Sequence, residues 1–76
     1  MSIEKYRGYI AEGFANPREN GKFEAVGRVS LDFQTIREAD VLGYHETSDG
    51  AQLQGILWAR YVIDTLHATN AASARG

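Results

Sequence analysis

The stretch FEAVGRVSLDFQ, residues 23–34, decides the fold of this chain. Apolar or small residues recur at every second position, namely Phe23, Ala25, Gly27, Val29, Leu31 and Phe33. Polar residues alternate with them, namely Glu24, Arg28, Ser30, Asp32 and Gln34, with Val26 as the exception. Alternation of this length is typical of a strand with one buried face. A slip of one residue would place charges in the core, so the pattern also fixes the inward face.

A second β-prone segment, Lys5–Ala15, precedes this strand. Its glycines, Gly8 and Gly13, indicate a bulge or a tight bend. Between the two segments lies Asn16–Gly21, which contains a proline for a turn corner and an Asn-Gly pair that tolerates positive φ. We therefore predict an antiparallel hairpin of the two strands around this loop.

The residues after the hairpin predict three further elements. The capping-box pattern Thr35-Ile36-Arg37-Glu38 predicts a short helical turn through about Asp40. Residues 41–46 are β-prone and predict a third strand. A long helix should follow, with Ser48 or Asp49 as its N-cap and Gln52 reaching back, and should end near His67 or Ala68.

The helix has two apolar surfaces. One, which we expect to pack on the sheet, comprises Gly55, Trp58, Ala59, Val62, Ile63 and Leu66, with Ile56 at its margin. The other comprises Leu53, Leu57 and Tyr61. A single sheet covers only one side of a helix. The second surface is therefore either covered by the chain's own hairpin or Ile36 connector, or used for association, and we predict an interface.

These elements define an α+β fold, a three-stranded antiparallel sheet packed against one long C-terminal helix. We expect one domain over residues 1–68 and a flexible tail over 69–76. A chain of 76 residues buries only about 60% of its unfolded surface, which leaves stability marginal without a partner. It has no cysteine, so a disulfide cannot supply the missing stability.

Charge and hydropathy argue against several function classes. The net charge is −2, and the basic residues are scattered, which is unlike a phosphate-binding surface. The first residues lack the apolar stretch of a signal peptide. The longest apolar run, residues 56–63, is interrupted by Arg60 and is too short for a bilayer. We therefore expect a cytoplasmic protein that binds neither membrane nor nucleic acid.

The residues that metal or acid–base chemistry would need are His45, His67, Glu38, Asp40 and Glu46. The adjacent His45 and Glu46 point to opposite faces of a strand, and His67 complements the helix dipole in the last turn. Ser30 is mid-strand and Ser48 is a helix cap, without the signature of a nucleophile. We expect no catalytic, cofactor or metal site, and we read the carboxylates as solvated surface charge.

Two short motifs carry a resemblance. Tyr6-Arg7-Gly8-Tyr9 at the start and Tyr61-Val62-Ile63-Asp64 near the helix end resemble a set of short, uncharacterised bacterial proteins, which open with Tyr-Lys-Gly-Tyr and end their helix in Trp-Ile-Asp. Here Val62 takes the usual tryptophan position and Trp58 lies a turn earlier. The resemblance implies a three-stranded sheet with a C-terminal helix and implies no activity.

The β-β-β-α order also resembles the N-terminal domain of HicB-type antitoxins, and a double-stranded-RNA-binding fold without its first helix. Where those antitoxins carry a Pro-Asp-Leu-Pro-Gly-type turn, this chain has residues 33–37, and where the RNA-binding domains place lysines it has the acidic and neutral Ser48–Gln52. Our leading prediction is a non-enzymatic module that forms a homodimer through its helix. The alternative is an antitoxin-like or nucleic-acid-associated regulator that acts with a partner chain.

Overall fold

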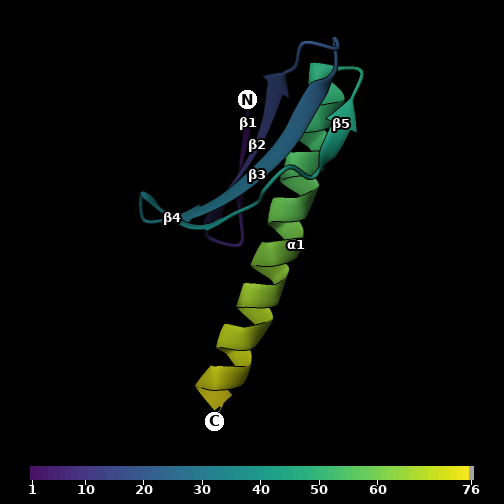
Figure 1. Ribbon diagram of the computed structural model, residues 1–76. Helices are drawn as coiled ribbons and strands as arrows, with labels where there is room; N and C mark the ends of the chain where they lie inside the picture. The colour runs from purple at the N-terminus through teal and green to yellow at the C-terminus, as the bar shows by residue number, and fades with distance from the viewer. Residues whose placement is uncertain (76) are drawn as a thin grey trace.

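The structure, a computed structural model, describes residues 1–75, with side chains through Thr69. A sheet of antiparallel strands packs against one long C-terminal helix, so the predicted α+β class is confirmed (Figure 1). The elements are β1 (Ser2–Tyr6), β2 (Tyr9–Pro17), β3 (Phe23–Leu31), β4 (Gln34–Glu38), β5 (Gly43–His45) and α1 (Ser48–Arg75).

The first four strands form a meander in the order β1-β2-β3-β4. The short β5 also pairs with β3, at the end of β3 that β4 leaves free. Between them the amides of Ala39 and Leu42 donate to the carbonyls of Gly27 and Ala25 at 2.9 and 2.8 Å. Residues 34–45 therefore run along a single edge of β3, and β1 forms the opposite edge of the sheet.

The predicted hairpin around the Asn16–Gly21 loop is confirmed, with Pro17 opposite Phe23 and Ile10 opposite Ser30. The predicted single strand Lys5–Ala15 is wrong, because it consists of two strands. Arg7 and Gly8 form a two-residue turn between β1 and β2, with φ values of 50° and 86°. Such turns need positive φ at both central residues, which Gly8 adopts without strain.

The predicted helical turn at Thr35–Asp40 is also wrong, because residues 35–38 belong to β4. Asp32 and Phe33 make a second two-residue turn, with φ values of 50° and 67°. The chain reverses there, and Thr35 pairs with Ser30 in the sheet. Pairing with β3 outweighs the local capping-box signal, since an isolated helical turn has little stability of its own. The last residue of the predicted inward face, Phe33, consequently lies outside the core and is exposed.

Both predicted ends of the helix need correction. The N-cap is Thr47, not Ser48 or Asp49: its hydroxyl accepts a hydrogen bond from the Gly50 amide at 3.0 Å. The helix continues to Arg75 rather than ending near His67, because residues 68–75 are rich in alanine and lack glycine and proline. The predicted flexibility of residues 69–76 stays a prediction, since this segment falls almost entirely beyond the described side chains.

The core lies between the helix and the inward face of the sheet. Its fully buried members are Ala11, Ala25, Val29, Ala51, Ala59 and Ile63. Trp58, Val62 and Leu66 are partly buried against them, so the predicted packing face of the helix is confirmed. Ile56, expected at the margin of that face, belongs to the core, with an exposed fraction of 5%.

Glycines hold the helix unusually close to the sheet. Gly13 and Gly27 are cross-strand partners in β2 and β3. A Cβ atom on Gly13 would lie 2.1 Å from the carbonyl oxygen of Gln52, and one on Gly27 would lie 2.7 Å from that of Gly55. Neither distance is compatible with a side chain. Past this crossing the helix continues beyond the strands, which gives a molecule of 50 × 19 × 15 Å (Figure 1).

Candidate functional site

The side of the helix that faces away from the sheet carries three large apolar side chains. Leu53, Leu57 and Tyr61 are 58%, 51% and 71% exposed. Their spacing of four residues turns each about 40° from the last, so they form a continuous ridge, here called the helix stripe. The chain's own hairpin does not cover them. Whether the helix stripe is an interface stays a prediction.

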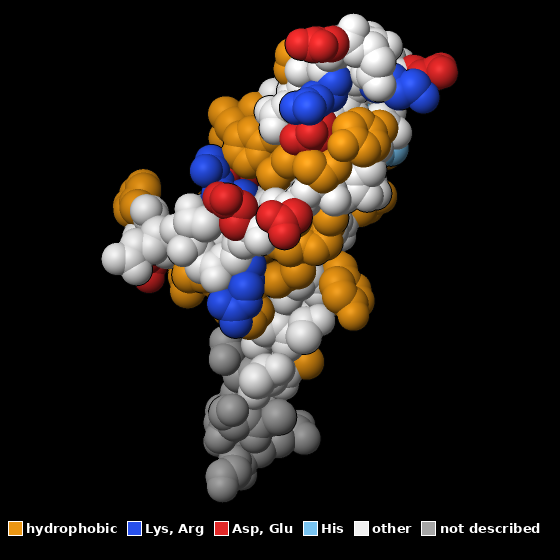
Figure 2. All heavy atoms as spheres, in the orientation of Figure 1, with side chains coloured by type: hydrophobic (Ala, Val, Ile, Leu, Met, Phe, Trp, Pro, Cys, Tyr) orange, Lys and Arg blue, Asp and Glu red, His pale blue; other side chains and the backbone are white. Residues whose placement is uncertain are grey.

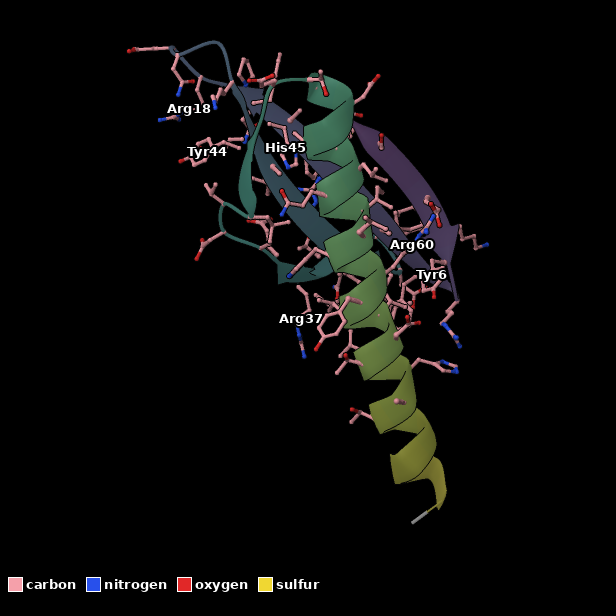
Figure 3. All side chains as sticks on the ribbon, turned by 90° about the vertical axis from the view of Figure 1, so that its right-hand side faces the viewer. Tyr6, Arg18, Arg37, Tyr44, His45 and Arg60 are labelled. Carbon is pink, nitrogen blue, oxygen red and sulfur yellow. The ribbon has the colours of Figure 1, made fainter. Side chains whose placement is uncertain are left out.

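On one side of the helix stripe, charged residues of the helix form ion pairs with β1 and with the turn that follows β1. Arg60 donates two hydrogen bonds to the carboxylate of Glu4, at 2.9 and 2.6 Å. Asp64 accepts from the Tyr6 hydroxyl at 2.9 Å and pairs with Arg7 at 2.8 Å. Figure 3 shows Tyr6 and Arg60 side by side at this edge. Arg60 and Asp64 lie one turn apart on the helix, yet each pairs with a partner outside it.

These contacts favour the charged forms of both arginines. The hydrogen bonds to Glu4 raise the pKa of the Arg60 guanidinium, and a hydrogen bond with Tyr6 together with the charge of Asp64 raises the pKa of Arg7. Both guanidinium groups also lie over the Tyr6 ring, 5.8 and 5.6 Å from its centroid. An apolar ridge beside fixed charges resembles the centre and rim of a protein interface.

The sheet face opposite the helix is open, because α1, the one helix of the described residues, packs on the other face. Figure 2 views the molecule from the β4–β5 edge of the sheet, where hydrophobic side chains lie with basic and acidic ones among them. At its middle Arg28 forms an ion pair with Glu12 and lies 4.7 Å from the centroid of the Phe14 ring. A groove of about 630 Å³ includes this pair. Residues of β1, β2, β3 and β4 line it, together with Gly8 and the Asp32–Phe33 turn. Sequence reasoning missed this groove.

The remaining candidate residues are dispersed. His45 is hydrogen-bonded to Gln54 of the helix, whose amide nitrogen donates to the Leu42 carbonyl at 3.2 Å, so this histidine fastens β5 to α1 (Figure 3). His67 is exposed on the helix. Ser48 accepts from Gln52 within the first helical turn. In the described part of the chain, no three His, Asp or Glu side chains are grouped to hold a metal ion.

Comparison with protein-family models, curated proteins and solved structures finds no match for this chain. The resemblances to short bacterial β-β-β-α proteins and to HicB-type antitoxins therefore stay predictions. No helix among the described residues has the length and apolarity needed to cross a bilayer. Two surfaces, the helix stripe and the open face of the sheet, are the features from which a function can be inferred.

Proposed function

We propose that this chain is a small interaction module that pairs with a second copy of itself through the helix stripe. A single observation carries the proposal. Three large apolar side chains, with half or more of their surface exposed, form a continuous ridge on the helix side that the sheet leaves bare. Contiguous apolar patches on a small protein usually mark association.

The spacing of the helix stripe suggests how two copies meet. A two-fold contact uses the same surface twice, so an axis through Leu57 places Leu57 against its counterpart and Leu53 against the second copy's Tyr61. Ridges formed by every fourth residue interdigitate at a crossing angle of about −50°. Helix axes about 8–10 Å apart would bury all three side chains from each copy.

Charge favours the antiparallel orientation of the two helices. In a parallel pair, Arg60 and Asp64 would each lie near the same residue of the other copy, which is repulsive. In the antiparallel pair Asp64 turns toward the other helix's N-terminus, where negative charge is stabilising. The ion pairs with Glu4 and Arg7 would then form one rim of the contact.

The proposed contact is modest in area. A standard interface buries about 800 Å² per partner, and three side chains with their rim bury less than that. Because the area is small, we expect a reversible dimer with a dissociation constant in the micromolar range. A constant of 1 μM corresponds to a binding free energy of about −8 kcal/mol.

Sedimentation equilibrium across the micromolar range tests the proposal. Leu57→Asp places a charge at the two-fold axis and should abolish self-association of the helix stripe. Thr69→Asp is the matched control, because it adds the same charge at an exposed position of the same helix, three turns away. A Leu57→Asp variant that associates as strongly as the Thr69→Asp variant would contradict the proposal.

A further inference from the structure

The turn between β3 and β4 displays an aromatic ring at a strained position. Both central residues have positive φ, 50° at Asp32 and 67° at Phe33. Asp, Asn and Gly suit such a turn, whereas a bulky residue is an outlier there. Phe33 is nonetheless fully exposed, with a relative exposure of 106%. Strain of this kind persists where another requirement outweighs it, often a binding function.

Phe33 also forms one wall of the groove on the open face of the sheet. The floor of the groove consists of Ile10, Glu12, Arg28 and Ser30, and its far wall of Ile3, Lys5 and Gly8. The surface therefore combines a protruding aromatic ring with a partly apolar hollow beside it. A two-fold contact uses the same surface on both copies, so each molecule must carry both the protruding ring and the hollow that receives it.

We infer that this surface is a second self-association site, in which Phe33 of each copy enters the groove of the other. Charge supports a second copy as the occupant. Asp32 lies beside Phe33, and Lys5 lies on the opposite wall of the groove. Arg28 is already paired with Glu12. Reciprocal exchange of Phe33 brings each Asp32 toward the Lys5 of the other copy, so that two favourable pairs form at once.

This contact is distinct from the proposed helix contact. The groove lies on the sheet face opposite α1, so one two-fold axis cannot serve both surfaces. Two different two-fold contacts on one chain produce assemblies larger than a dimer, and produce a tetramer when the arrangement closes. The groove contact does not require the helix contact, because either contact alone yields a dimer.

Sedimentation equilibrium of four proteins separates the two contacts: the parent, Phe33→Gly, Leu57→Asp and the double variant. We expect assemblies above the dimer for the parent, dimers for each single variant and monomers for the double variant. If only the groove contact exists, the parent is a dimer that Phe33→Gly dissociates and Leu57→Asp leaves intact. A Phe33→Gly variant that associates like the parent overturns the inference, whatever Leu57→Asp does.

A measurement of the unfolding midpoint shows whether Phe33→Gly loses association without losing its fold. Glycine adopts positive φ without strain, so Phe33→Gly should raise the unfolding midpoint at dilutions where the parent is monomeric.

Exchange of the two charges tests the proposed pairing of Asp32 with the Lys5 of the other copy. Lys5→Asp and Asp32→Lys should each weaken association at least several-fold, and the double variant should restore it. A double variant that associates no better than either single variant would contradict this arrangement of the two copies.

Discussion

Gly13 of β2 and Gly55 of α1 lie against each other where the helix crosses the sheet. A Cβ atom added to Gly55 would stand 2.7 Å from the Gly13 Cα and 2.3 Å from the carbonyl oxygen of Val26. Both neighbours are backbone atoms, which cannot turn aside as a flexible side chain does. The helix can therefore lie on β2 and β3 only where these positions lack side chains.

Gly55→Ala should destabilise the protein despite the higher helix propensity of alanine. Overpacking typically costs about 1–3 kcal/mol, which exceeds the gain of about 1 kcal/mol from removing a helical glycine. Gly50→Ala is the control, because its added Cβ would meet only side-chain atoms, the Thr47 hydroxyl oxygen and the His45 ring, at 3.0 Å or more. Denaturant unfolding should show a clearly larger loss for Gly55→Ala. Equal midpoints would mean that the helix does not cross the sheet this closely.

Trp58→Ala should cost about 3 kcal/mol, the lower end of the range for a large aromatic side chain, because Trp58 is only partly buried. Its ring covers Gly27, where an added Cβ would come within 2.6 Å of it. In a domain this small, such a loss is a large part of the total stability. Thermal unfolding within a few degrees of the parent would show that Trp58 contributes little to the core.

Phe33→Gly should stabilise the monomer by about 1 kcal/mol, because it removes a non-glycine residue from the left-handed region. Phe33 contributes nothing to the core, so no packing is lost. Chemical unfolding at the lowest practical concentration measures this effect without a contribution from association. A loss of stability would mean that the Phe33 ring packs against its own chain.

Glu4→Gln should loosen β1 more than the rest of the sheet. The Glu4 carboxylate holds Arg60 by two hydrogen bonds, and β1 is an edge strand paired only with β2. Amide exchange should accelerate in residues 2–6 and change little in β3. Because the pair is partly exposed, the difference from the parent should shrink at high salt. Uniform acceleration across the sheet would mean that Glu4 supports the global fold.

The sequence pattern predicts the parts of this fold that follow a single period. Alternation along residues 23–31 correctly places Ala25, Gly27 and Val29 against the helix. The 3.6-residue period likewise identifies Ala59 and Ile63 as core. Gly8 indicates a bulge or a tight bend, but neither Arg7-Gly8 nor Asp32-Phe33 is an Asn-Gly type pair, so the sequence does not predict a hairpin turn at either place. β4 also contains an irregularity, since pairing with β3 shifts between Arg37 and Thr35 and leaves Ile36 as an extra residue, which disrupts the alternation.

The two candidate surfaces differ in how visible they are in the sequence. The helix stripe lies within one element at a regular spacing, so the spacing of its residues is enough to identify it. The groove is formed by residues from four strands and two turns, and its shape depends on the reversal at Asp32 and Phe33. The sequence carries one signal for the groove. The alternating pattern of the strand breaks at Phe33, a phenylalanine at the point where the strand ends.

The proposed two-fold contact at the helix stripe is tested most directly by a cysteine at its axis. The chain has no cysteine of its own, so a single Leu57→Cys substitution introduces the only thiol. In the proposed dimer the two Cys side chains meet at the axis, within the roughly 4.4–6.8 Å between Cα atoms that a disulfide spans. Mild oxidation should therefore convert Leu57→Cys rapidly to a covalent dimer and leave a Thr69→Cys control monomeric on denaturing gels. Equal rates of cross-linking for the two variants would contradict the contact.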